Sequence, residues 1–277
     1  MVIQAVRGFN DIIDESDIAR LHDIESKLVL IAQSHGYTEV RLPFLENIDL
    51  YQRSIGATSD IVSKEMYSFT DKSDEILCLR PEGTASCIRA AIEHNALYEG
   101  SKKWYYHSPM FRRERPQKGR YRQFYQFGME AIGINEPYVD IEHIILINDL
   151  FAELNIQKQI RLELNYLGGS DTRAKYKQAL QEYYSKYSDI MGDTDKKRLE
   201  ENPLRILDSK DAQLQEINAT APKMSSYYNT TEQTSLETIV NLLEDNAIKY
   251  TIQPYLVRGL DYYGGLIYEW ISSELGA

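Results

Sequence analysis

The twenty residues FRRERPQKGRYRQFYQFGME, from Phe111 to Glu130, are the stretch from which the fold can be inferred first. Aromatic residues and residues that favour β-strands run from Trp104 to Arg113 and return from Tyr121 to Ile132. Between them lies a polar loop with a proline and a glycine, the residues that most often mark turns. The pattern predicts two long strands joined as a β-hairpin.

The loop of this predicted hairpin is strongly basic in an acidic protein. Residues 101–123 contain eight Lys or Arg residues and one acid, Glu114, whereas the whole chain has a formal net charge of -11. A local concentration of positive charge attracts anions. The pattern is typical of a site for phosphate or nucleic acid, although an ordinary surface hairpin with charged residues would show it too.

The second predicted strand has two different faces, because side chains alternate along a strand. One face is apolar or aromatic throughout, at Tyr125, Phe127 and Met129. The other carries a ring, an amide, a glycine and a carboxylate, at Phe124, Gln126, Gly128 and Glu130. We interpret the first face as core and the second as the floor of a pocket, in which Gly128 leaves room for a ligand close to the sheet.

The composition is that of an ordinary globular protein. With 277 residues, 43% of them hydrophobic and 26% charged, the chain is long enough for one large domain or two smaller ones. No apolar run reaches the roughly 18 residues needed to span a bilayer, and the first residues do not resemble a secretion signal. We therefore expect a cytoplasmic protein without a membrane-spanning segment.

Residues that bind metals are few and scattered. Cys78 and Cys87 lie nine positions apart without a nearby histidine pair, so we expect buried free thiols rather than a disulfide or a metal site. The five histidines are dispersed, which argues against a protein-bound zinc ion. The net negative charge argues against indiscriminate nucleic acid binding, but not against a local basic docking face.

Hydrophobic periodicity predicts elements on both sides of the hairpin. Apolar positions at three- and four-residue steps predict an amphipathic helix over 16–34, with Ser16 as N-cap and Gly36 at its end. Further helices are predicted at 85–94 and 138–154, and strands at 37–45, 66–69, 76–80, 160–165, 250–253 and 266–270. Residues 55–65 are polar and glycine-containing, which predicts a loop.

A change of character marks residues 166–247, where helix formers dominate and strand patterns vanish. We predict a helical insertion domain here, within a core of residues 1–165 and 248–277. Its helices are predicted at 173–187, 193–201 and 236–245. Its Tyr183, Tyr184 and Tyr187 could stack on nucleic acid bases, or simply pack in a core.

A carboxylate and a hydroxyl follow the strand predicted at 76–80. Glu82 and Thr84 stand directly before the helix at 85–94. Glu82 could accept hydrogen bonds from an ammonium group, and Thr84 could add a further acceptor. Alternatively, Thr84 caps the helix and Glu82 complements its dipole.

The sequence LVRGLDYYGG, at 256–265, combines one arginine, one acid and two phenols in a glycine-flanked turn. Its charged residues are Arg258 and Asp261, and its phenols are Tyr262 and Tyr263. Glycines permit unusual backbone angles at such a turn. The stretch is suited to a ligand-binding loop, and it is equally compatible with a wide hairpin connection.

Three of these stretches together resemble the histidyl-tRNA synthetases, a family of class II aminoacyl-tRNA synthetases. YTEVRLPFLE (37–46), after a long helix, is similar to the first class II motif, and FRRERPQKGRYRQFYQFGMEAIG (111–133) to the second. LVRGLDYYGG (256–265) is similar to the histidine-specific signature. The likeness is collinear from about residue 5 to residue 276, and it covers the catalytic region of the family.

The resemblance implies an α+β fold, with an antiparallel six-stranded sheet flanked by helices, a helical insertion and a homodimer formed through the first motif. It also implies a histidine–tRNA ligase. In that reaction histidine attacks the α-phosphate of ATP, with Mg²⁺ bridging the phosphates, and the histidyl group of the adenylate then passes to tRNA(His). The implied partners are histidine, ATP and the tRNA(His) acceptor stem, with no membrane.

The resemblance also assigns roles to residues. The implied histidine ligands are Glu82, Thr84, Gln126, Glu130, Tyr262 and Tyr263, of which Glu82 and Thr84 hold the α-ammonium group and Glu130 and Tyr263 the imidazole. The implied ATP ligands are Arg112, Glu114, Arg120, Tyr121 and Phe124. Arg112 and Arg258 are the implied catalytic residues, because cations stabilise charge on the α-phosphate. A covalent nucleophile and a protein-bound metal are not implied.

The resemblance to the family stops at the last residues of this sequence. The family continues with a glycine-rich strand, a third motif whose arginine binds the γ-phosphate of ATP, and an anticodon-binding domain. We therefore expect a truncated chain that is inactive or weak in aminoacylation. The alternative is a histidine-binding regulatory paralogue that serves the ATP phosphoribosyltransferase of histidine biosynthesis, but the residues of the second motif and the histidine signature favour the enzyme.

Overall fold

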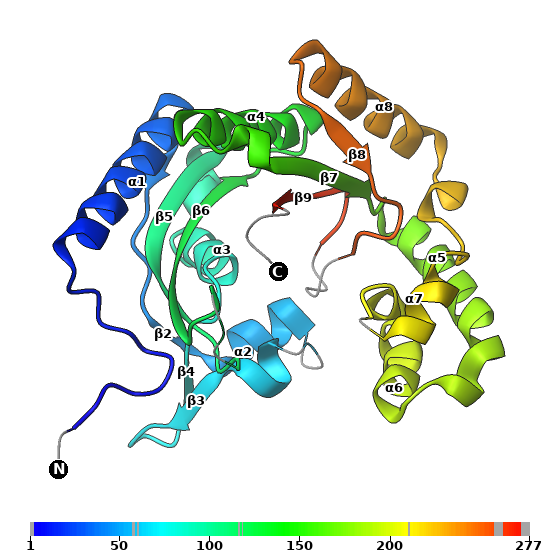
Figure 1. Ribbon diagram of the computed structural model, residues 1–277, viewed down its shortest axis with the longest axis horizontal. Helices are drawn as coiled ribbons and strands as arrows, with labels where there is room; N and C mark the ends of the chain where they lie inside the picture. Colours follow the sequence, from blue (N-terminus) through cyan, green and yellow to red (C-terminus); the bar gives the residue numbers. More distant parts are fainter. Residues whose placement is uncertain are drawn as a thin grey trace. The chain divides into compact units, whose positions relative to one another are not determined.

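The computed structural model describes residues 3–56, 59, 61–115, 117, 119–209, 211–257 and 263–272. The chain divides into two compact units, Met1–Asn135 and Glu136–Ala277. Figure 1 shows the elements of both units. The predicted ligands Arg258 and Tyr262 lie outside the described residues.

The first unit combines a long helix, a long hairpin and a small sheet (Figure 1). Its α-helices are α1 (Glu15–Ser34), α2 (Ile48–Tyr51) and α3 (Thr84–Glu93). Its strands are β1 (Thr38–Glu39), β2 (Leu45–Asn47), β3 (Tyr67–Thr70), β4 (Ile76–Leu79), β5 (Lys102–Phe111) and β6 (Gln123–Ile132). Shorter turns are π-helical at Gln52–Gly56 and Ile61–Glu65 and 3₁₀-helical at Ala96–Glu99.

The predicted hairpin is confirmed. Strands β5 and β6 pair antiparallel in an unbroken register from Lys102 opposite Ile132 to Phe111 opposite Gln123. The short strand β1 pairs parallel to β5. In Figure 1, α1 and α3 lie on opposite sides of this hairpin.

Both faces of the hairpin contribute buried residues, so the prediction that the face of Tyr125 is core holds in part: Tyr105 on that face is 3% exposed and stacks on Phe127. The buried cluster on the Glu130 side consists of Leu42, Cys87, Ala90, Tyr106 and Met110, with Phe124 packed against it. On the other face Tyr125 is 57% exposed. Helix α3 covers the first face closely, whereas α1 leaves a cavity of about 320 Å³ against Tyr125 and Phe127.

Helix α1 begins one residue earlier than predicted and has a different N-cap. The carboxylate of Asp14 accepts hydrogen bonds from the amides of Ser16 at 2.9 Å and Asp17 at 3.2 Å. A carboxylate is a stronger acceptor than the serine hydroxyl that was predicted in this role, and it complements the helix dipole. Gly36, with a φ of +79°, follows the end of the helix as predicted.

The strand predicted at 37–45 is split into β1 and β2, and a buried arginine explains the split. Nη1 of Arg80 donates to the carbonyls of Leu42 at 2.9 Å and Pro43 at 3.1 Å. These carbonyls are therefore not used in a strand ladder, and a proline has no amide to donate. Beyond this point β2 joins the antiparallel sheet in the order β2, β4, β3.

The loop predicted at 55–65 contains helical turns instead. The structure has π-helical turns at Gln52–Gly56 and Ile61–Glu65. In this stretch Ser59 makes local bonds, since the amide of Val62 donates to its hydroxyl at 3.2 Å and the hydroxyl of Ser63 donates to its carbonyl at 2.7 Å. Serine side chains compete locally for backbone groups in this way.

The second unit has a sheet and a helical part (Figure 1). Its α-helices are α4 (Pro137–Glu153), α5 (Ser170–Tyr184), α6 (Asp193–Glu201), α7 (Ala212–Asn218) and α8 (Thr230–Asp245). Its strands are β7 (Ile160–Tyr166), β8 (Tyr250–Ile252) and β9 (Leu266–Ser272). The 3₁₀ turns are Gln157–Gln159, Ser185–Ile190, Pro203–Ile206 and Met224–Tyr227.

In the second unit β7 is the central strand of its sheet. Strand β8 pairs parallel to β7 and β9 pairs antiparallel to it. Side chains of α4, α8 and β7 form a buried cluster that includes Ile144, Leu164 and Leu243. The six-stranded antiparallel sheet implied by the resemblance is not seen as one continuous sheet among the described strands, which are grouped as β1-β5-β6, β2-β4-β3 and β8-β7-β9.

The helical part of the second unit has its own core, and its tyrosines belong to that core. Tyr184 is fully buried, and its hydroxyl donates to Oδ1 of Asn218 at 2.5 Å. Tyr183 and Tyr187 pack against the same cluster. Packing is therefore the role that the structure shows for these rings, while the insertion domain predicted at 166–247 stays a prediction.

The structure agrees with the prediction about the cysteines. Cys78 and Cys87 are both buried free thiols. Across the described ranges, His, Cys, Asp and Glu side chains form no group of three or more suited to a metal ion. No described helix combines the length and the apolar character needed to cross a membrane.

Candidate functional site

Glu82 stands where strand β4 gives way to helix α3. Its side chain is almost completely buried, with 3% of the residue exposed. Its Oε2 accepts from the amide of Thr84 at 2.6 Å and its Oε1 from the amide of Ala85 at 3.0 Å. The carboxylate thus binds the free amides at the start of α3, and burial raises its pKa although these hydrogen bonds lower it.

Thr84 does not cap the helix with its hydroxyl. Its Oγ1 donates to Oε1 of Glu130, near the end of strand β6, at 2.7 Å. The hydroxyl of Tyr106 donates to the same oxygen at 3.3 Å. Burial, and to a lesser extent the charge of Glu82, raises the pKa of Glu130 to about 7. The hydrogen bonds from Thr84 and Tyr106 lower this pKa, but by less than burial raises it.

Tyr106 is a site residue that the sequence did not reveal. Its ring lies between Gly83 and Gly128, and a Cβ at either glycine would overlap the ring. Gly128 therefore makes room for Tyr106 rather than for a ligand, which corrects the prediction. The signal was available, because Tyr106 is directly opposite Gly128 in the hairpin register, but it needed the register to be known.

Gln126 carries an unsatisfied atom on the same face of β6. Its Oε1 is buried and has no hydrogen-bond partner in the structure. A buried acceptor without a partner costs about 1–3 kcal/mol. Such an atom, on the same strand face as Glu130, is a position where a ligand can donate a hydrogen bond.

The basic end of the hairpin begins beside this cluster. Nε of Arg112 donates to the carbonyl of Pro81, the residue before Glu82, at 2.8 Å. The guanidinium of Arg112 lies over the ring of Phe124, with Cζ 5.2 Å from the ring centroid. One nitrogen of Arg112 remains 3.9 Å from Oε1 of Glu114, so the cation is held in place while 23% of its side chain stays exposed.

Glu114 lies between two arginines of the loop. Its Oε1 faces Arg112, and its Oε2 is 3.4 Å from Nη1 of Arg120. Arg120 has 51% of its side chain exposed, and Tyr121 is 45% exposed. The predicted ATP ligands thus form a group that leads from Phe124, packed against the core of the hairpin, to the exposed basic loop.

The structure brings most of the predicted ligands together in the first unit. On the face of the hairpin that packs against α3 lie the predicted histidine ligands Glu82, Thr84, Gln126 and Glu130. The predicted ATP ligands Arg112, Glu114, Arg120, Tyr121 and Phe124 lie at the end of the hairpin that carries the basic loop. Of the remaining predicted ligands, Tyr263 belongs to the second unit, where it packs against the helical core.

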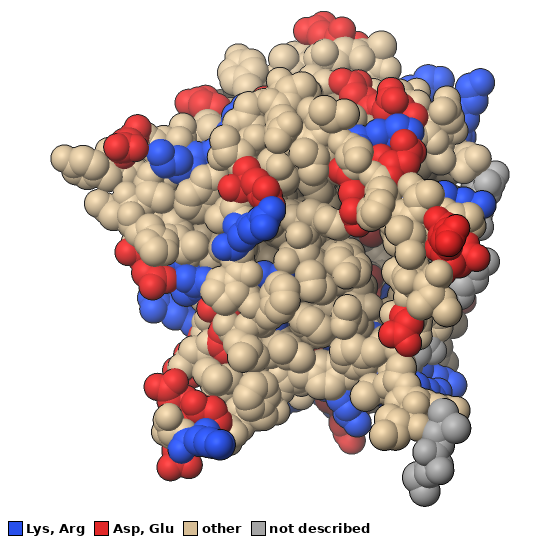
Figure 2. All heavy atoms as spheres, turned by 90° about the vertical axis from the view of Figure 1, so that its left-hand side faces the viewer, with Lys and Arg blue, Asp and Glu red and all other residues tan. Residues whose placement is uncertain are grey.

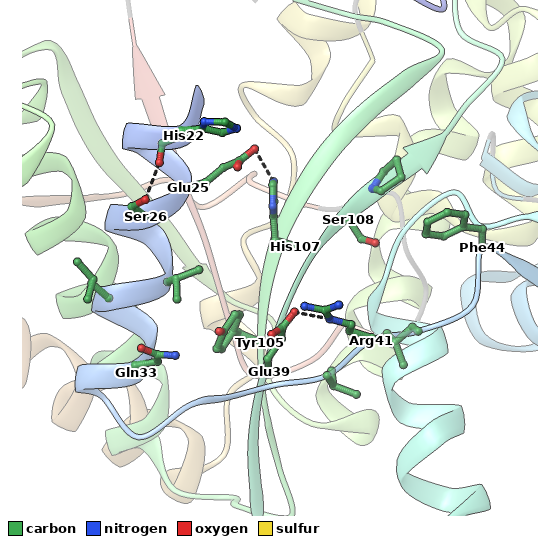
Figure 3. Close-up of a pocket in the computed structure, with 15 residues that line it drawn as sticks. His22, Glu25, Ser26, Gln33, Glu39, Arg41, Phe44, Tyr105, His107 and Ser108 are labelled. Atoms are coloured by element: carbon green, nitrogen blue, oxygen red, sulfur yellow. Dashed lines mark hydrogen bonds and ion pairs between the residues drawn. The ribbon is translucent and has the colours of Figure 1, made fainter. Parts of the chain in front are cut away.

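A cavity of about 1000 Å³ lies elsewhere, between α1, the segment 39–44 and β5. In Figure 3, His22 and Glu25 project from α1 towards His107 of β5. Nε2 of His107 is 3.8 Å from Oε1 of Glu25. None of the predicted ligands lines this cavity, and one of its walls comes from the stretch that resembles the first class II motif.

Comparison with known proteins gives consistent matches over nearly the whole chain. A family model described as histidyl-tRNA synthetase matches residues 8–277. A histidine–tRNA ligase of Francisella philomiragia subsp. philomiragia is 47% identical over 273 residues, which are 98% of this chain and 64% of that protein. The chain thus spans less than two thirds of the length of this curated relative.

Solved structures show the same likeness. The apo histidyl-tRNA synthetase of S. aureus superposes with a TM-score of 0.77 at 32% identity, over 97% of this chain and 61% of that one. A Bacillus halodurans protein titled as an ATP phosphoribosyltransferase regulatory subunit/histidyl-tRNA synthetase superposes with a TM-score of 0.69 over 100% of this chain and 74% of that one. At 19% identity the latter match shows the fold alone. The α+β class predicted from the sequence is confirmed.

Proposed function

The chain belongs to the histidyl-tRNA synthetase family, and from this premise we propose that it is the catalytic region of a histidine–tRNA ligase, which activates histidine with ATP and transfers it to tRNA(His). The observation that carries the proposal is the convergence of Glu82, Thr84 and Glu130 on one side of the hairpin, with the unpaired Oε1 of Gln126 further along the same face of β6. Two buried carboxylates with an open acceptor are suited to a small cationic, hydrogen-bonding ligand such as an amino acid.

In the proposed complex Glu82 and Thr84 hold the α-ammonium group and Glu130 binds the imidazole. Glu130 is suited to this role because its pKa near 7 is close to that of a free imidazole. The pair can therefore share a proton at neutral pH. Gln126 Oε1 would accept a hydrogen bond from the ligand, and the sequence pattern alone supports Arg258, Tyr262 and Tyr263 as further ligands.

ATP would bind along the basic end of the hairpin. Arg112 is suited to the α-phosphate, because its guanidinium is fixed by Pro81 and Phe124 and needs no rearrangement to face the phosphate. Phe124 offers a ring for the adenine, and Glu114, Arg120 and Tyr121 lie further along the loop. Arg112 and Arg258 would stabilise the charge that develops as the histidine carboxylate displaces pyrophosphate.

Mg²⁺ belongs to the proposal through ATP, since phosphate oxygens are its usual ligands in such sites. We propose that it accompanies the ATP phosphates. The acceptor stem of tRNA(His) would lie against residues 113–122, where Arg113 and Arg115 are exposed. Exposed arginines are suited to the phosphate backbone.

The proposed homodimer forms through α1 and the segment 39–44. Several apolar side chains of this part are exposed, among them Leu30 at 65% and Phe44 at 50%. Figure 2 shows this side of the first unit, where small charged groups are separated by uncharged surface. Exposed apolar surface of this kind is typical of an interface. The cavity of about 1000 Å³ in Figure 3 lies on the same side.

Histidine-dependent exchange of labelled pyrophosphate into ATP tests the proposed reaction. Exchange that requires histidine supports the enzyme. Histidine binding without exchange is the result expected both of an impaired catalytic region and of the regulatory paralogue, for which the structural likeness at 19% identity offers only a common fold. A protein that shows neither exchange nor histidine binding would contradict the proposal.

A further inference from the structure

Residues 6–9 form a tight turn beside the base of the basic loop. The amide of Phe9 donates to the carbonyl of Val6 at 2.9 Å. Gly8 has a φ of +88°, a conformation that side chains rarely adopt. The turn presents the carbonyls of Arg7 and Gly8 to the hairpin.

On the hairpin, Arg122 is the residue that contacts this turn. Its amide donates to the carbonyl of Gly8 at 2.8 Å, and its Nη1 donates to the carbonyl of Arg7 at 3.3 Å. Its carbonyl accepts from the amide of Arg112 at 3.0 Å, and its Nε donates to the carbonyl of Glu114 at 3.2 Å. One residue therefore connects the turn to both sides of the loop.

The contact between the turn and Arg122 is closely packed. A Cβ on Gly8 would lie 2.7 Å from Cγ and 2.8 Å from Cδ of Arg122. Phe9 packs its ring 5.9 Å from the ring of Tyr67 and 6.4 Å from that of Phe111, measured between centroids. Even a methyl group at Gly8 would therefore displace either the turn or Arg122.

The opposite side of the loop has its own remote contact. The amide of Arg113 donates to the carbonyl of Glu65 at 2.6 Å. Both strands of the loop are thus held at their base by backbone acceptors from distant parts of the chain. The side chains of Arg112, Glu114 and Arg120 lie at or beyond this base, where small displacements change how they meet a phosphate.

We propose that residues 6–9 are a positioning element for the ATP-binding loop, acting through the contact between Gly8 and Arg122. The turn fixes the loop in the geometry that binds ATP, and it leaves the histidine-binding cluster of Glu82, Thr84 and Glu130 unaffected. The inference rests on the proposed function of the loop. Gly8 and Arg122 act through Arg112 and Glu114, so they are positioning residues.

The substitution Gly8→Ala tests the proposal, with Gly36→Ala as its matched control. Gly36 also has a positive φ, +79°, but a Cβ there meets no atom within 4 Å. Both substitutions strain the backbone alike, and only Gly8→Ala disturbs Arg122. Two measurements are made on each full chain: amide hydrogen exchange at Arg122 and across residues 111–123 without ligand, and separate titrations with ATP and L-histidine.

Gly8→Ala should speed exchange at Arg122 and weaken ATP binding by about tenfold, with less than about a twofold change for L-histidine. Unchanged exchange and ATP affinity in Gly8→Ala would overturn the proposal, and so would the same losses in Gly36→Ala. If the wild-type protein binds no ATP, the proposed function fails, while faster exchange at Arg122 in Gly8→Ala alone would still support the fixing of the loop by the turn.

Discussion

The hydroxyl of Thr84 donates a 2.7 Å hydrogen bond to Oε1 of Glu130, across 46 positions of sequence. The contact joins the first residue of α3 to a residue near the end of β6, and the hydroxyl of Tyr106 donates to the same oxygen. Thr84 also donates its amide to Glu82. Two carboxylates are thereby held near each other in a buried place, which is unfavourable for the free protein and is typical of a site that binds a cation.

Glu130→Gln should stabilise the free protein at pH 8. The folded carboxyl has a pKa of about 7 against an ordinary value of 4.5, so its ionised form is disfavoured in the fold. The penalty is complete above about pH 7 and disappears as the pH falls towards 4.5, because the folded state binds the proton first. We expect a gain of about 2 kcal/mol in the free energy of unfolding at pH 8, and none near pH 4.5.

Denaturant unfolding of the wild-type protein and of Glu130→Gln, between pH 4.5 and pH 8, measures the difference in the free energy of unfolding. Glu46→Gln is the control, because Glu46 is also buried but pairs with Arg89 at 2.8 Å. It should lower the free energy of unfolding at pH 8. A Glu130→Gln variant that is less stable than wild type at pH 8 would show that the Glu130 carboxylate is favoured in the fold.

Gly128→Ala should destabilise the protein, because its Cβ would overlap the ring of Tyr106. Neither partner can move freely, since Tyr106 is 2% exposed and packs in the core of the hairpin. Overpacking of this kind costs about 1–3 kcal/mol. Thermal unfolding should show this loss of stability. Gly192→Ala is the control, because a Cβ at Gly192 meets nothing within 4 Å. It should change the free energy of unfolding by less than about 1 kcal/mol. Equal stability of the two variants would argue against the packing described.

Arg80→Met should be costly although the new side chain is apolar and of similar length. Arg80 is fully buried, its guanidinium donates to the carbonyls of Leu42, Pro43 and Pro109, and burial lowers its pKa. The substitution leaves these carbonyls without partners, for an expected loss of about 2–4 kcal/mol in urea unfolding. Arg20→Met, at a side chain that is 77% exposed, should change stability by less than about 0.5 kcal/mol. A small effect of Arg80→Met would mean that water replaces the guanidinium.

Leu30→Asp should dissociate the proposed homodimer. Leu30 is 65% exposed on α1, on the side that carries the cavity of Figure 3, and a charge there would lose its hydration in an interface. We expect the dissociation constant from sedimentation equilibrium to rise by at least about tenfold. Ile190→Asp, at a residue 52% exposed in the second unit, should leave it unchanged. A wild-type protein that stays monomeric at micromolar concentration would refute the dimer.

The sequence predicted local elements well wherever one strong pattern controlled them. The hairpin followed from two aromatic runs around a proline and a glycine, and α6 has the predicted bounds, 193–201. Predictions failed where a distant side chain decided the outcome. Arg80 divides the strand predicted at 37–45, and Asp14 rather than Ser16 caps α1. Helix α7 was missed because its seven residues are too few to show a period.

The candidate site shows the same limit. The residue types and their order pointed to Glu82, Thr84 and Glu130. The sequence could not show that both carboxylate oxygens of Glu82 accept hydrogen bonds from amides at the start of α3. Nor could it show that Tyr106 fills the space left by Gly128. Both facts depend on which residues the fold places opposite each other. The free Oε1 of Gln126 likewise follows from packing alone.

Calorimetric titration with L-histidine at pH 8 tests the central claim most directly. The wild-type chain should bind histidine, and Glu130→Ala should weaken that binding by at least about tenfold while ATP affinity stays within about twofold. Glu39→Ala, which removes an exposed carboxylate paired with Arg41, should bind both ligands like the wild type. Histidine binding that survives Glu130→Ala unchanged, or a wild-type chain that binds no histidine, would contradict the account.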